Sequence, residues 1–278
     1  MGQDQDTRSD RIATGISPEI ADKITATAHR LADVARQETL RWFRSPDLHP
    51  QNKAQAGFDP VTDADRASER AMRAILDAER PEDAILGEEF GARAGQSGLT
   101  WVLDPIDGTR AFMAGAPSWG VLIGVTDDRG PIYGIVDQPH LGERFEGGFG
   151  RAVLTGRDGT TPLRARRGVD LSEATLMSTY PEVGSAHEHT AFRRVADRAR
   201  LTRYGLDCYA YALLAAGHVD LVIEAGLQSY DVVAPIAVVQ AAGGVITDWT
   251  GGDAHHGGRI IAAGSPELHA QALELLAG

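Results

Sequence analysis

Acidic side chains gather in three clusters along this chain, each beside a short apolar segment or a predicted helix. The clusters are Glu88 with Glu89, Asp104 with Asp107, and Asp231. Carboxylates that lie close together repel one another unless cations neutralise their charge. Oxygen ligands with few histidines or cysteines among them suit Mg²⁺ better than Zn²⁺. If the clusters converge in space, they predict a site for divalent cations.

The residues around Asp104 add a feature that could bind an anion. Residues 104–109 have the sequence Asp-Pro-Ile-Asp-Gly-Thr. Pro105 restricts the backbone in this turn, and Gly108 allows a close approach of the backbone. A helix that begins near Gly108 and Thr109 would offer free N–H groups to a phosphate. Metal ions beside such a helix end predict metal-assisted hydrolysis of a phosphate ester.

The composition argues against several other kinds of protein. The chain of 278 residues has 27 Lys and Arg against 39 Asp and Glu, and its net charge of −12 disfavours nucleic acid as a partner. The single cysteine, Cys208, cannot form an intrachain disulfide. No apolar stretch approaches the roughly 18 residues that span a bilayer, and the N-terminus lacks the apolar region of a signal peptide. We therefore expect a cytoplasmic protein with a small-molecule substrate and no membrane partner.

Hydrophobic periodicity and turn signals predict the elements that position the acids. A helix should begin at Ser17–Pro18 and another after Thr62, because serine and threonine cap helices and proline favours the first turn. Strands are predicted over 84–86, 101–103, 118–126, 132–136, 144–146, 152–155, 219–224, 245–248 and 260–262, and further helices over 232–242 and after Ser265. The pattern indicates an α/β protein of layered sheets and helices, α+β over residues 1–160 and α/β over 161–278.

These motifs resemble those of the inositol monophosphatase-like, lithium-sensitive phosphatases, which depend on Mg²⁺. Residues 87–89 match the Gly-Glu-Glu element of that family, and residues 104–109 match its Asp-Pro-Ile-Asp-Gly-Thr signature. Asp231 matches the aspartate of its Trp-Asp element, in which Tyr230 replaces the tryptophan. The resemblance covers the chain from about residue 59 to 252. It implies an αβαβα sandwich, two or three Mg²⁺ ions per site and a homodimer.

The resemblance also implies which residues hold the metal ions. Glu88, Asp104 and the carbonyl of Ile106 would hold the first Mg²⁺. Asp104, Asp107 and Asp231 would hold the second, so that Asp104 bridges the two ions.

Further positions match the family residues that act on water and phosphate. Asp65 would hydrogen-bond Thr109, and this pair, beside Glu88, would orient the attacking water. The N–H groups of Gly108 and Thr109 would receive the phosphate. The implied reaction is in-line attack by water. A covalent aspartyl-phosphate, as in haloacid-dehalogenase-type phosphatases, is disfavoured because Asp104 and Asp107 are three residues apart rather than two.

Two more acids bear on the substrate. Asp207 and Glu224 match family positions that face the substrate, and added carboxylates suit a cationic leaving group. Residues 207–220 and the pair Tyr230-Asp231 are most similar to the histidinol-phosphate phosphatase branch, which implies a role in histidine biosynthesis. The alternatives are a helix N-cap for Asp207 and a surface strand end for Glu224.

Two other functions stay open at this point. One is hydrolysis of inositol 1-monophosphate or of a broader range of sugar and nucleotide phosphates. The other, of a different class, is a catalytically silent protein that binds metal and phosphate. The intact set of acids favours turnover.

Overall fold

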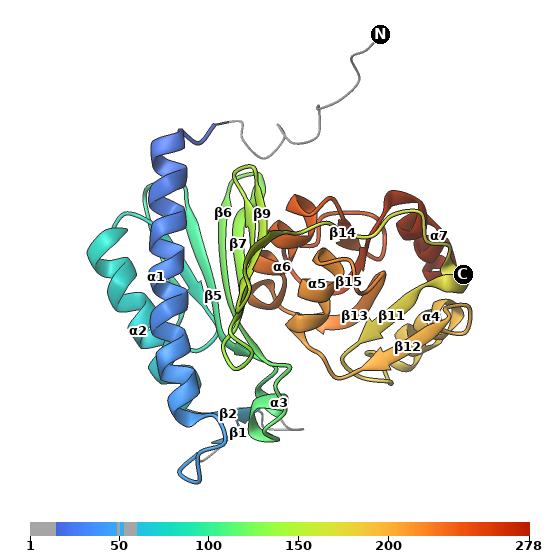
Figure 1. Ribbon diagram of the computed structural model, residues 1–278, viewed down its shortest axis with the longest axis horizontal. Helices are drawn as coiled ribbons and strands as arrows, with labels where there is room; N and C mark the ends of the chain where they lie inside the picture. The colour runs from blue at the N-terminus through green and yellow to red at the C-terminus, as the bar shows by residue number, and fades with distance from the viewer. Residues whose placement is uncertain (1–14, 49–50, 53–59) are drawn as a thin grey trace.

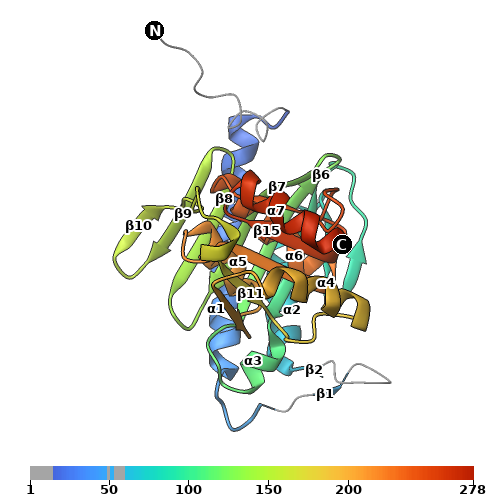
Figure 2. The same ribbon diagram turned by 90° about the vertical axis from the view of Figure 1, so that its right-hand side faces the viewer.

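The computed structural model describes residues 15–48, 51–52 and 60–278, and these form alternating layers of helices and sheets (Figure 1). The first helical layer pairs α1 (Pro18–Trp42) with α2 (Asp63–Glu79). An eight-stranded sheet follows, then α5 (Cys208–Ala215) and α6 (Ser229–Ala241), then a five-stranded sheet. Helices α4 (Ala186–Ala196) and α7 (Pro266–Ala277) form the last layer, which faces the viewer in Figure 2. The predicted αβαβα sandwich is therefore confirmed.

The eight-stranded sheet is antiparallel except where β3 pairs with β5, and its spatial order is β10-β9-β8-β7-β6-β5-β3-β4. Its strands are β3 (Ala84–Gly87), β4 (Gly91–Arg93), β5 (Thr100–Asp107), β6 (Gly120–Asp127), β7 (Gly130–Gln138), β8 (Glu143–Gly148), β9 (Arg151–Gly156) and β10 (Gly159–Pro162). The short helix α3 (Thr109–Met113) follows β5 directly. Two two-residue strands, β1 (Gln51–Asn52) and β2 (Pro60–Val61), pair separately.

The five-stranded sheet is mixed, in the order β12-β11-β13-β15-β14. It is parallel from β12 to β13 and antiparallel from β13 to β14. Its strands are β11 (Thr175–Ser178), β12 (Leu201–Tyr204), β13 (Leu221–Leu227), β14 (Val245–Asp248) and β15 (Gly258–Ala263), preceded by the 3₁₀ turn η2 (Leu171–Glu173). Strands β11 and β12 and helix α4 were not predicted. Each strand has only four residues, too few for a clear apolar alternation.

Local capping explains where the predicted helices begin. Ser17 accepts a hydrogen bond from the N–H of Ile20 at the start of α1, and Thr62 and Asp65 form a capping box on α2. Helix α6 begins at Ser229 instead of at residue 232. The reason is that the Asp231 carboxylate accepts the Gln228 N–H at 2.6 Å, which makes Asp231 part of the first turn.

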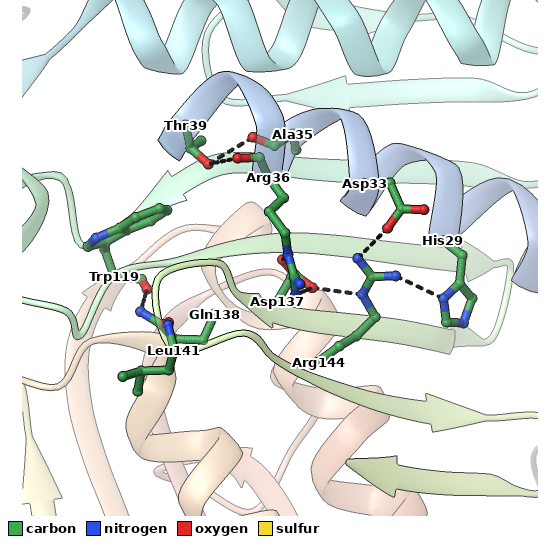
Figure 3. A network of polar contacts seen from close by, with 10 residues as sticks. All are labelled: His29, Asp33, Ala35, Arg36, Thr39, Trp119, Asp137, Gln138, Leu141 and Arg144. Atoms are coloured by element: carbon green, nitrogen blue, oxygen red, sulfur yellow. Dashed lines mark hydrogen bonds and ion pairs between the residues drawn. The ribbon is translucent and has the colours of Figure 1, made fainter. Parts of the chain in front are cut away.

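An ion-pair network fastens α1 to the eight-stranded sheet (Figure 3). Asp137 on β7 is fully buried, and one of its oxygens lies 2.7 Å from Arg36 of α1 and 2.7 Å from Arg144 of β8. The next residue, Gln138, donates to the carbonyls of Pro117 and Trp119 in the segment between α3 and β6. Through Asp137 and Gln138, the end of β7 thus binds both helix α1 and the segment between α3 and β6.

A row of glycines brings α6 against the same sheet. Gly124, Gly134 and Gly147 lie opposite one another on β6, β7 and β8. A Cβ atom on Gly134 would stand 2.5 Å from the carbonyl oxygen of Ala234, and one on Gly147 would stand 2.5 Å from the Cα of Val238. Since these are backbone atoms of α6, the absence of side chains in this row sets how closely the helix approaches the sheet.

We expect Gly134→Ala to displace α6 and to lower the free energy of unfolding by about 1–3 kcal/mol, the usual cost of an overpacked core. Activity should fall with it, because Asp231 lies in the first turn of α6. Urea denaturation and steady-state kinetics measure the two effects. Gly156→Ala on β9 is the control, since its Cβ would come no closer than 3.9 Å to Glu143. Equal stability of the two variants would contradict the packing argument.

Candidate active site

Three of the predicted acids meet at the junction of β5 and α6. One carboxylate oxygen from each of Asp104, Asp107 and Asp231 lies within 4.8 Å of the other two. Asp104 and Asp107 belong to β5, and Asp231 belongs to the first turn of α6. Residues far apart in the chain therefore converge on one point, as the clusters predicted.

A bulge in β5 makes this convergence possible. Side chains three residues apart on a regular strand point to opposite faces of the sheet. Asp104 pairs with Leu122 and Asp107 with Gly120, so β5 has one residue more than β6 over this stretch. The extra residue lets both aspartates reach the same site. Within the bulge, the N–H of Ile106 donates to Asp104 at 3.0 Å.

Burial and mutual repulsion dominate the electrostatics of this set. Burial raises the pKa of Asp104 well above its ordinary value, and the charges of Glu88, Asp107 and Asp231 raise it further. Burial also raises the pKa of Asp107, and the charge of Asp207 raises it further. The hydrogen bond that the N–H of Cys208 donates to Asp107, at 2.6 Å, lowers this pKa in part. The pKa of Asp231 is raised to about 7, mainly by burial. Closely spaced acids, largely removed from solvent, that repel one another in this way fit a hard divalent cation such as Mg²⁺.

Glu88 and Ile106 lie beside this set. Glu88 follows β3, is half-buried and raises the pKa values of Asp104 and Asp231 through its charge. The carbonyl of Ile106 accepts the Thr109 hydroxyl at 3.1 Å. The structure thus places Glu88 near Asp104, as predicted, and brings the Ile106 carbonyl into the turn that follows.

The hydrogen bond expected between Asp65 and Thr109 is not formed. One oxygen of Asp65 accepts the N–H of Thr62 at 2.8 Å and its hydroxyl at 2.5 Å, because the capping box of α2 uses that oxygen. Thr109 instead donates to Ile106. The other oxygen of Asp65 is buried without a hydrogen-bond partner, and burial raises the pKa of this carboxyl to about 7.

A cavity of about 250 Å³ opens beside Asp104, Asp107 and Asp231, which together form the acid set. Gly108 and Thr109 lie in its wall together with Asp207, Glu224 and Asp231. Gly108 has φ of +82°, and a Cβ on it would stand 2.9 Å from the carboxyl carbon of Asp207. Glycine is required here both for the left-handed backbone and for the close approach of Asp207.

Asp207 and Glu224 both line this cavity, Asp207 at the N-cap position of α5 and Glu224 away from the surface. Asp207 precedes α5 but caps none of its N–H groups, and it has φ of +48°, a strained conformation for a residue with a side chain. Glu224 is not at the surface, because only 5% of it is exposed. It accepts hydrogen bonds from Tyr211 at 2.8 Å and from the N–H of Thr179 at 3.0 Å. Burial raises the pKa values of both acids, that of Asp207 to about 7.

Three further residues of the cavity were not predicted. Arg110 and Tyr180 meet at its wall, where the guanidinium lies 5.2 Å from the ring centre and contacts the phenol oxygen. Tyr211 is buried behind Glu224. The position of Arg110 directly after residues 104–109 could have indicated it, whereas nothing in the sequence around Tyr180 does so.

The chain belongs to the inositol monophosphatase family, whose model matches residues 20–277. It is therefore a phosphatase of this metal-dependent family. It is 41% identical over 268 residues to the Arabidopsis thaliana protein "Bifunctional phosphatase IMPL2, chloroplastic", covering 92% of this chain and 75% of the relative. It is 36% identical to a Mycobacterium tuberculosis histidinol-phosphatase, covering 84% and 90% of the two chains. A solved inositol monophosphatase from Zymomonas mobilis superposes with a TM-score of 0.81 at 39% identity, covering 95% and 100%.

Among the described residues, no helix combines the length and the apolar character needed to cross a membrane.

We expect the affinity for Mg²⁺ to fall as the pH drops below about 7. Asp231, with a pKa raised to about 7, is protonated below this value, and the proton then competes with the cation. Each unit of pH below 7 should weaken binding by up to about ten-fold for one coupled proton. Calorimetric titration with MgCl₂ at pH 6, 7 and 8 measures this effect. An affinity that is the same at all three values would contradict it.

Proposed function

We propose that the chain is a Mg²⁺-dependent histidinol-phosphate phosphatase, which converts histidinol phosphate and water to histidinol and phosphate. The observation that carries this proposal is the pair of acids, half-buried Asp207 and buried Glu224, in the cavity next to the acid set. Histidinol has an ammonium and an imidazole group, and both suit carboxylates in a partly desolvated pocket. The histidinol-phosphatase relatives support the same substrate.

In this proposal the acid set holds two or three Mg²⁺ ions. Glu88, Asp104 and the carbonyl of Ile106 would bind one ion, and Asp104, Asp107 and Asp231 another. Bound Mg²⁺ supplies charge neutralisation at the phosphate and makes water a better nucleophile. The protein contributes preorganised carboxylates, which burial keeps in place.

Other residues of the site act on the water and on the phosphate. Asp65 has one buried oxygen without a partner, which is available to accept a hydrogen bond from a water molecule. The Thr109 hydroxyl, in the turn after Ile106, would complete the orientation of that water. The N–H groups of Gly108 and Thr109, at the start of α3, are the proposed contacts of the phosphate.

Inositol 1-monophosphate is the second candidate substrate. The Zymomonas mobilis neighbour is titled as an inositol monophosphatase, and the Arabidopsis thaliana relative is named as bifunctional. The neutral hydroxyls of an inositol could donate hydrogen bonds to Glu224, but they carry no positive charge to attract Asp207. A cytoplasmic location, a homodimer and a division of the chain near residue 160 remain predictions.

We expect Asp207→Asn to impair histidinol phosphate more than inositol 1-monophosphate. Loss of the charge removes the attraction to a cationic alcohol, so the ratio of the two kcat/KM values should fall by about ten-fold or more. A phosphate-release assay with both esters measures the ratio. Asp128→Asn, in an exposed hairpin turn, is the control. An equal loss for both esters would reject Asp207 as the cation-binding group.

Asp104→Asn tests the phosphatase assignment itself. Because Asp104 is the proposed bridge between two ions, its neutral substitute should lower kcat by a factor on the order of 10³. The circular dichroism spectrum should stay unchanged, since the amide has nearly the shape of the carboxylate. Near-normal turnover by this variant would refute the bridging role.

A further inference from the structure

A buried glutamate outside the acid set faces the turn that carries Glu88. Glu69 lies on α2 and has no exposed surface. Its carboxylate accepts the N–H of Glu89 at 2.7 Å and the N–H of Phe90 at 3.3 Å. Arg73, one turn further along α2, donates to the same carboxylate at 2.7 Å. The ion pair with Arg73 offsets the cost of burying Glu69 and leaves its oxygens directed at the turn.

The residue before Glu88 must be glycine for this contact to exist. A Cβ on Gly87 would stand 1.9 Å from Oε1 of Glu69 and 2.4 Å from its carboxyl carbon. Any side chain at position 87 would therefore displace the Glu69 carboxylate. The first residue of the Gly-Glu-Glu element is thus explained by a contact with α2 and not by the metal ions themselves.

Glu88 is consequently held from both sides along the backbone. Its own N–H donates to the carbonyl of Leu103 at 3.1 Å, on the neighbouring strand β5. The two N–H groups that follow it are bound by Glu69. Leu103 immediately precedes Asp104, so these contacts fix the turn relative to the aspartate with which Glu88 interacts.

We propose that Glu69 is a positioning residue that holds the turn after β3 so that Glu88 is presented to the metal site. The inference rests on the proposed role of Glu88 as a ligand. Without Glu69, two backbone N–H groups lose their acceptor, and the turn has to be ordered at the expense of binding free energy when the cation arrives. Residues that orient metal ligands in this way typically contribute 10–100-fold to metal affinity.

The test is calorimetric titration of the whole chain with MgCl₂ in the absence of substrate. Glu69→Ala should weaken Mg²⁺ binding by about ten-fold or more, and Glu69→Gln should weaken it less, because the amide oxygen can still accept an N–H. Glu79→Ala is the matched control. Glu79 lies on the same helix and pairs with Arg30 of α1, so its loss should lower the melting temperature without changing the affinity for Mg²⁺.

Glu88→Gln separates this inference from the proposed function. If Glu88→Gln weakens Mg²⁺ binding and Glu69→Ala does not, the positioning role is wrong and the ligand assignment stands. If neither variant changes the affinity, the assignment of Glu88 is wrong and the positioning role falls with it. Loss of affinity in Glu69→Ala, with wild-type affinity in Glu79→Ala, supports the proposal.

Discussion

Repulsion among one buried and two half-buried carboxylates is the constraint on which the rest of this structure depends. Asp104, Asp107 and Asp231 lie within 4.8 Å of one another, and burial adds to the cost of their charges. Such a set is unfavourable until cations occupy it, so the surrounding fold has to hold it in place. The bulge in β5, the glycine row below α6 and the ion-pair network at Asp137 supply that rigidity from three directions.

The site is shared between the two sheets. The eight-stranded sheet contributes Asp104 and Asp107. The other side of the site contributes Glu224 from β13, Asp231 from α6, and Asp207, which directly precedes α5. The close approach of Gly108 and Asp207 joins the two sides where the phosphate is expected. The acids of the proposed metal site and those of the proposed substrate pocket thus come from different elements that meet at one cavity.

Several residues have both a structural and a proposed chemical role, and Asp65 shows the consequence. One of its oxygens completes the capping box of α2, which removed the hydrogen bond that we expected with Thr109. The other oxygen is left buried without a hydrogen-bond partner, in a position where the charges of Glu88 and Glu89 act on it. The two oxygens of Asp231 also have separate roles, because one of them accepts the Gln228 N–H in the first turn of α6. Capping fixes the rotamer of each carboxylate and so directs the remaining oxygen.

The sequence alone determined the order of the acids, the signature over residues 104–109, the layered α/β class and the caps of α1 and α2. These features depend on residue types and on neighbours a few positions away, which a single sequence displays. Only the tertiary structure decided that Asp104 and Asp107 face one site, that Asp207 lies against Gly108 and that Glu69 binds the turn after β3. These contacts join residues distant in the chain. They arise from the bulge in β5 and from close backbone packing, which leave no periodic signal in the sequence.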